Sequence, residues 1–203
     1  MSKQIKGSIF ILLSAFFFGT YGVWSKMMGG IFDDFFQGWT RAIIIVAILS
    51  VFGIVFKQMR KIDKEDFKHY LIYAVPGALV VPAYFYGFTH LTIGTATLLF
   101  YASLTITNYV LGVLFFKEKM APIKLMSLIL GLMGLYVIFS FSFKELLIPM
   151  VISSLSGICG GIEVTFTKRL SDKYSPIQLT TFLYTVSFFI CFIFYSFHPR
   201  EHH

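Results

Sequence analysis

Two charged side chains lie inside stretches of sequence that are otherwise apolar enough to cross a membrane. Arg41 stands about six residues into one such stretch, which corresponds to about 9 Å of helix. Glu163 stands four to five residues before the cytoplasmic end of another, predicted over 146–167. An ionised group at the centre of a bilayer costs at least about 2.5–3.5 kcal/mol, so such residues are candidates for function.

Arg41 has two interpretations. Its planar guanidinium suits bidentate binding of an anionic or carboxylate group of a substrate. Alternatively, the long side chain reaches the outer headgroups or pairs with Asp33 or Asp34, which precede it on the outer side.

Glu163 also has two interpretations. A carboxylate that is partly removed from water favours its protonated form, so it can take up a proton or attract a cation in a cavity. Alternatively, it pairs with Lys168 or Arg169 at the membrane edge. Two further ionisable residues, His90 in a short outer turn and Glu118 between Lys117 and Lys119, are better explained by solvent contact and local pairing.

Aromatic residues make up 19% of the chain, and most of them must face lipid or neighbouring helices. An aromatic cavity can hold organic cations or flat apolar molecules. The aromatic and amide candidates for a substrate site have polar tips or lie near Arg41: Tyr21, Trp24, Gln37, Trp39, Tyr84, Tyr86, Tyr101 and Asn108.

The elements that position these residues are membrane helices. Hydrophobic residues make up 57% of the 203 and charged residues only 13%, against about 25% charged in an average soluble domain. The net charge of +7 comes from basic residues between the apolar runs and does not indicate nucleic-acid binding. The sequence predicts an all-α integral membrane protein with about seven spans, near 6–27, 35–56, 70–89, 93–116, 122–142, 146–167 and 175–197.

The distribution of Lys and Arg predicts the orientation. With the N-terminus in the cytoplasm, 13 of the 17 basic residues are cytoplasmic, as expected for loops that are retained inside. We therefore expect a multi-pass protein of the cell (inner) membrane. Cys159 and Cys191 lie in apolar runs and are interpreted as packing residues, and no cofactor or metal site is predicted.

An internal repeat relates the first and sixth spans. Ser14, Gly19 and Lys26 have the same spacing as Ser156, Gly161 and Lys168. A second match places Gln37 of the second span against Gln178 of the seventh. Five spans separate the two starts, so the second unit enters the membrane in the opposite direction, as in the inverted repeats of many transporters.

The chain resembles the EamA-type drug/metabolite transporters. The resemblance rests on the glycine-containing first span that ends in Lys26, on Arg41, on 96–101 with the continuation to 116–119, and on Gly131 and Gly134. That family has two five-helix units. The resemblance therefore implies one complete unit over 1–142 and a partial second unit of two helices over 143–203. The fourth span lacks the family's usual proline, with Ala102, Ser103 and Leu104 near its place.

The resemblance implies an exporter or exchanger of small metabolites or drugs that works by alternating access between the two repeats. The alternative is a non-transporting membrane protein, or an inactive fragment that needs a second chain to supply three further helices. The expected partners are the lipid bilayer, a small-molecule substrate and either a second copy or a completing chain. An enzyme is not expected, because the sequence contains no H-E-x-x-H, G-x-S-x-G or aspartate-rich motif.

Overall fold

The computed structural model describes residues 3–29, 31–117 and 147–197, together with the isolated positions 123, 126, 129–131, 133, 134 and 137. Within these residues the fold is all-helical, which confirms the predicted fold class. The helices are α1 (Lys3–Gly29), α2 (Asp34–Val55), α3 (Lys64–His90), α4 (Ile93–Phe116), α6 (Leu147–Leu170) and α7 (Pro176–Phe197). All six are long and apolar enough to cross a membrane. The predicted fifth span, 122–142, lies largely outside the described residues.

Side-chain caps begin α2 and α4, at polar breaks in the sequence. The carboxylate of Asp33 accepts hydrogen bonds from the backbone N–H groups of Phe35 and Phe36 and so caps α2. The turn between α3 and α4 contains only Leu91 and Thr92, and the Thr92 hydroxyl accepts the N–H of Thr95. These turns make α3 and α4 antiparallel neighbours.

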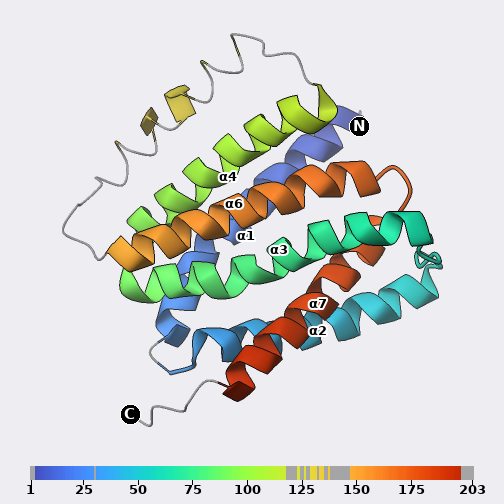
Figure 1. The fold of residues 1–203 in the computed structure, drawn as a ribbon, viewed down its shortest axis with the longest axis horizontal. Coiled ribbons are helices and arrows are strands. Elements are labelled where there is room, and N and C mark those ends of the chain that lie inside the picture. The colour runs from blue at the N-terminus through green and yellow to red at the C-terminus, as the bar shows by residue number, and fades with distance from the viewer. Residues whose placement is uncertain are drawn as a thin grey trace.

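The centre of the molecule is α6, which lies between α3 and α4 (Figure 1). Glycines on α6 allow this close approach. A Cβ atom at Gly157 would collide with the backbone oxygen of Phe100, and one at Gly161 would lie 2.5 Å from the Cβ of Thr107. Membrane helices do not associate through the hydrophobic effect, because lipid is as apolar as they are. Small residues let their backbones approach closely and so gain packing contacts.

A second packed pair, α2 and α7, lies beside α3 (Figure 1). Gly38 of α2 faces Cys191 of α7, whose sulfur would lie 2.8 Å from an added Cβ. Cys191 is fully buried, in agreement with its interpretation as a packing residue.

Helix α1 is much more exposed than the other five. It is tied to the α3–α4 end by Gly22, which packs against Phe88 and Ile93, and by the Lys26 ammonium, which donates to the Leu91 carbonyl at 3.4 Å. Along most of its length its large apolar side chains are open, and Ile11 is 70% exposed. Most of its surface is therefore available to lipid or to another helix.

Candidate functional site

A cavity of about 850 Å³ lies between α1 and the helices α3, α4, α6 and α7. Its walls come from the interior of each helix rather than from the ends: 10–17 of α1, 77–84 of α3, 100–104 of α4, 160–164 of α6 and 183–187 of α7. The cavity is therefore placed about halfway through the helical bundle. This is the depth at which transporters of the inverted-repeat type bind substrate.

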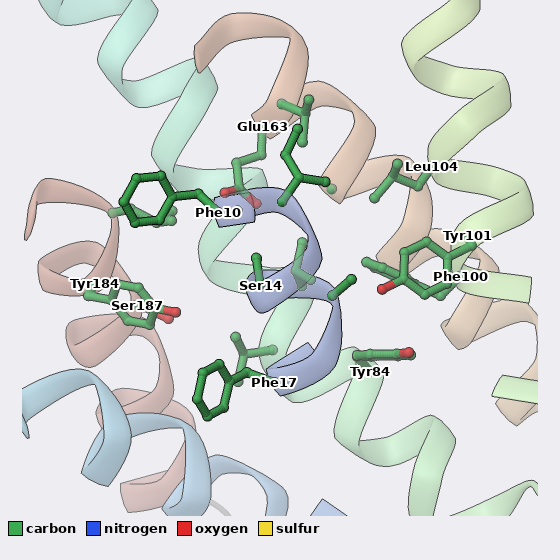
Figure 2. A pocket seen from close by; sticks show the side chains of 18 residues that line it. Phe10, Ser14, Phe17, Tyr84, Phe100, Tyr101, Leu104, Glu163, Tyr184 and Ser187 are labelled. Carbon is green, nitrogen blue, oxygen red and sulfur yellow. The ribbon is translucent and has the colours of Figure 1, made fainter. Parts of the chain in front are cut away.

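The polar groups of the cavity converge from all five helices. Figure 2 shows α1 between the α7 side chains Tyr184 and Ser187 and the α4 side chains Phe100 and Tyr101. The polar lining side chains are Ser14, Tyr84, Tyr101, Glu163, Tyr184 and Ser187. A mostly apolar wall with a few convergent polar groups is the usual composition of a small-molecule site.

Glu163 is half-buried and is the one charged side chain among the described residues of the wall. It precedes Leu170, the last residue of α6, by seven positions, so it lies deeper than the sequence indicated. Gly77 of α3 makes room for it, because a Cβ there would lie 3.0 Å from the Glu163 Cγ. No cation among the described residues lies within ion-pair distance of its carboxylate.

The structure does not place Glu163 in the local ion pairs that were one of its two interpretations. Lys168 lies over the ring of Phe116, with its ammonium 5.0 Å from the ring centroid. Arg169 follows it on α6 and is exposed, near the helix end. The Glu163 side chain instead points into the cavity beside α1 (Figure 2).

Two of the aromatic candidates, Tyr84 and Tyr101, line the cavity. Tyr84 stacks on Phe100 with ring centroids 4.3 Å apart, and Tyr101 meets Phe100 edge to face at 5.1 Å. The Tyr84 hydroxyl donates to Thr97 at 3.4 Å. These contacts fix a rigid aromatic wall between α3 and α4.

Arg41 and Asn108 are half-buried but do not line the cavity. The Arg41 guanidinium lies over the ring of Phe85, 4.8 Å from its centroid. The Asn108 side-chain oxygen accepts a hydrogen bond from the Thr165 hydroxyl at 3.0 Å and so joins α4 to α6. The structure therefore gives both side chains packing contacts within the bundle.

Four of the remaining candidates also lie away from the cavity. Gln37 is buried and donates to the Phe32 carbonyl, Trp39 packs among aromatic rings of α2 and α7, and Tyr86 stacks on His90 at 4.0 Å. Trp24 is 60% exposed. The side chain of Tyr21 lies outside the described ones.

Sequence reasoning missed Ser14, Gly77, Phe100, Tyr184 and Ser187 as cavity residues. Two of them carried a usable signal. Ser14 is the first residue of the internal repeat, and Gly77 directly follows Pro76 in the interior of α3. Phe100 and Tyr184 are indistinguishable in sequence from the many aromatic residues that pack against helices or lipid.

A polar network closes the molecule at the end where the α2–α3 and α6–α7 connections meet. The Asp66 carboxylate accepts hydrogen bonds from the Lys173 ammonium at 2.9 Å and from the Tyr174 hydroxyl at 3.0 Å. Gln178 accepts the Arg60 backbone N–H at 2.9 Å and donates to the Arg60 carbonyl at 2.7 Å.

Two more contacts complete the network. The Tyr174 hydroxyl accepts the Asp63 backbone N–H at 3.2 Å, and Ser175 donates to the Gln58 carbonyl at 2.8 Å. Hydrogen bonding to Asp66 raises the pKa of Lys173 above its ordinary value. Burial raises the pKa of Tyr174, so both side chains keep their donor protons at neutral pH.

Comparison with known proteins gives one match. A family model described as the EamA-like transporter family matches residues 5–140, which is about two thirds of the chain. No curated protein and no solved structure matches the chain. The family consists of membrane transporters of small molecules rather than enzymes.

Proposed function

Because the chain belongs to the EamA-like transporter family, we propose that it binds a small molecule in the cavity beside Glu163 and exposes it alternately to the two sides of a membrane. The cavity is the observation that carries this proposal, since it lies at half the depth of the bundle and combines an apolar wall with six polar side chains. We assign it as an exporter or exchanger in the cell inner membrane, with a cytoplasmic N-terminus.

The proposed mechanism requires two units that move against each other, over 1–142 and from 143 onward. The contacts of α6 support this division. Helix α6 begins the second unit and yet packs deepest into α3 and α4 of the first unit, so the cavity is bounded by helices of both units. Rocking of α6 and α7 against α3 and α4 would change access to the cavity on either side.

The polar network around Asp66 serves as the closed gate in this mechanism. Each of its side-chain hydrogen bonds joins a residue of 58–66, in the first unit, to a residue of 173–178, in the second. With the N-terminus in the cytoplasm, these two connections are cytoplasmic. The structure would then be the state in which the cytoplasmic side is closed.

A cysteine placed at Ser14 tests the proposed function. In a background with Cys159→Ala and Cys191→Ala, Ser14→Cys would be reconstituted in liposomes filled with a mixture of amines, amino acids, organic acids and nucleosides. Mass spectrometry would then measure the solutes that the protein releases. Thiol modification should block release through Ser14→Cys and leave Phe16→Cys active, since Phe16 is also on α1 but outside the cavity. Equal blocking of both variants, or no protein-dependent release of any solute, would contradict the proposal.

A second candidate function is supported by α1. Gly161 of α6 is packed against α4, whereas no atom of the described residues lies within 4 Å of a Cβ at the repeat-related Gly19 of α1. Helices α3 and α4 of the first unit thus cover α6. Among the described residues, no helix pair covers α1 in the same way. We therefore keep the alternative that this chain acts only after another chain completes the assembly.

A further inference from the structure

Resting on the proposed function, we propose that the cavity selects amphipathic organic cations, in which a protonated or quaternary nitrogen is attached to an aromatic body, and that Glu163 is the group that recognises the positive charge. The juxtaposition that carries this inference is one carboxylate in an aromatic cavity, with no cation among the described residues within ion-pair distance of it. The sequence alone left a carboxylate-binding role for Arg41 equally open.

The charge of the cavity is negative. Among its described lining residues Glu163 carries the one formal charge, and the other polar groups are hydroxyls of Ser and Tyr. A carboxylate in a partly dehydrated site is stabilised by a cation that arrives with the ligand. An anionic ligand would instead place two like charges together, which weakens binding.

The neighbours of Glu163 do not neutralise it. Tyr73 of α3 and Tyr184 of α7 are the titratable side chains that interact with its charge, and phenols are uncharged at neutral pH. From α4 the cavity receives the phenol of Tyr101, and from the described part of α1 it receives the hydroxyl of Ser14. Arg41 lies over Phe85 and is not among the residues that line the cavity.

The rest of the wall suits the apolar body of such a ligand. The stacked pair of Tyr84 and Phe100 lies on one side of α1, and Phe10 and Phe17 of α1 project on its other side, where Tyr184 lies (Figure 2). Aromatic faces attract cations, and the attraction is stronger where water is excluded. They also stack on flat ring systems. The volume of about 850 Å³ accommodates a ligand with several fused or linked rings.

A headgroup series separates recognition of charge from recognition of rings. The full chain in detergent would be titrated with naphthylethylammonium, naphthylethanol and naphthylacetate, and naphthalene fluorescence would report binding. These probes keep the same ring and change only the charge. We expect the ammonium to bind about tenfold or more tightly than the alcohol, and the carboxylate to bind more weakly than both. Equal binding of all three, or a preference for the carboxylate, would overturn the inference.

Glu163→Gln is the decisive variant, because it removes the charge and keeps the size of the side chain. It should lower the affinity for naphthylethylammonium about tenfold or more and leave the affinity for naphthylethanol unchanged. Glu65→Gln is the matched control, since Glu65 is an exposed carboxylate at the start of α3 outside the cavity. An unchanged ammonium affinity in Glu163→Gln would contradict the role of this residue.

Two further measurements keep the test decisive if Glu163→Gln fails to fold. Glu163→Asp retains the charge and should retain the order of the headgroup series, and the wild-type series is informative without any variant. The inference can also fail separately from the proposed function. Suppose that the protein releases neutral or anionic solutes, that Glu163→Gln does not change this release, and that modification of Ser14→Cys blocks it. The protein would then be a transporter with another specificity. Absence of both binding and release would count against both proposals.

Discussion

At the scale of single residues, the position of Glu163 depends on a glycine in the neighbouring helix. Gly77 lies against the Glu163 side chain and against Leu183, so the wall at this point has room for the carboxylate and for little else. The sequence identified Glu163 because a charge in an apolar stretch is conspicuous. It could not show that Gly77 of α3 faces it, because that pairing depends on how α3 and α6 are rotated about their axes.

Gly77→Ala should therefore weaken ligand binding while the protein still folds. The added Cβ would lie 3.0 and 3.1 Å from the Glu163 Cγ and Cδ and 2.5 Å from the Leu183 Cδ1, so these side chains must shift. Such overpacking costs about 1–3 kcal/mol. We expect a severalfold loss of naphthylethylammonium affinity together with a lower thermal midpoint in detergent.

The control for this substitution is Gly7→Ala, because no atom lies within 4 Å of a Cβ at Gly7. It should change neither the affinity nor the thermal midpoint by a measurable amount. Gly77→Ala with the affinity of the wild type would show that the cavity does not hold Glu163 in the observed position.

The candidate site was only partly predictable from residue types. Glu163, Tyr84 and Tyr101 were selected and line the cavity. Arg41, Trp39 and the other selected residues were chosen by the same criteria, polarity or proximity to a charge. These criteria do not distinguish a side chain that faces a cavity from one that faces a neighbouring helix. That distinction depends on how each helix is rotated about its axis. A sequence pattern reveals this rotation when one face of the helix is polar, but not when both faces are apolar.

At the scale of helices, the sequence was far more informative. The boundaries of α2, α4 and α7 agree closely with the predicted spans, because polar and helix-capping residues such as Asp33 and Thr92 mark them. The packing of the helices against one another was harder to predict from the sequence. The glycines of α6 were expected to allow close contact, but which helix they contact follows only from the arrangement in which α4 lies across Gly157 and Gly161.

The repeat-related glycines of α6 and α1 should respond differently to the same substitution. Gly161→Ala places a Cβ 2.5 Å from the Thr107 Cβ and should lower the free energy of unfolding by about 1–3 kcal/mol. Gly19→Ala meets nothing within 4 Å and should be neutral or stabilising by up to about 1 kcal/mol. Thermal or denaturant unfolding in detergent measures both variants, and equal destabilisation would contradict the packing of α6.

The proposed gate between the α2–α3 and α6–α7 connections, which the expected orientation places on the cytoplasmic side, gives an element-scale prediction about accessibility. Asp66→Asn removes the carboxylate that accepts hydrogen bonds from Lys173 and Tyr174. It should open the cytoplasmic side more often. A membrane-impermeant thiol reagent on that side should therefore label Ser14→Cys severalfold faster. Asp63→Asn is the control, because only its backbone N–H contacts Tyr174, and its labelling rate should match that of the parent.

The same gate should be insensitive to pH through the neutral range. Hydrogen bonding to Asp66 raises the pKa of Lys173, and Lys173 lowers the pKa of Asp66, so both partners are ionised through the neutral range. The ion pair is lost as the pH rises through the raised pKa of Lys173 or falls through the lowered pKa of Asp66. Labelling of Ser14→Cys from the cytoplasmic side should thus be constant between pH 6 and about 8 after correction for thiol reactivity. A steep change in that interval would point to another titrating group at the gate.

At the scale of the whole molecule, the six described helices form a packed body with one incompletely covered member. Helix α3 shares one core with α6 and α7 and a second with α4. Helix α2 packs with α7, whereas α1 contacts the body mainly near its Lys26 end. The helical character and the six described spans could be predicted from hydropathy. The exposure of α1 could not, because its sequence is as apolar as that of the buried helices and differs only in what lies beside it.

Exposed small residues on α1 predict association through this helix. Lipid solvates apolar side chains well, but membrane helices with small residues gain packing energy from close contact with another helix. In the absence of a completing chain, we expect two copies of the 203-residue chain to meet along α1. Light scattering in mild detergent should give a mass above that of the 23.2 kDa monomer.

Cysteine crosslinking locates that contact. With Cys159 and Cys191 replaced by Ala, Gly19→Cys should form an intermolecular disulfide under mild oxidation. Ile54→Cys should not, although Ile54 of α2 is 72% exposed. A disulfide requires Cα atoms within about 7 Å of each other. Random collisions in the membrane would crosslink the Gly19 and Ile54 variants alike, whereas a defined contact along α1 favours Gly19→Cys. A monodisperse, heat-resistant monomer, or equal crosslinking at both positions, would show that lipid alone is sufficient to cover α1.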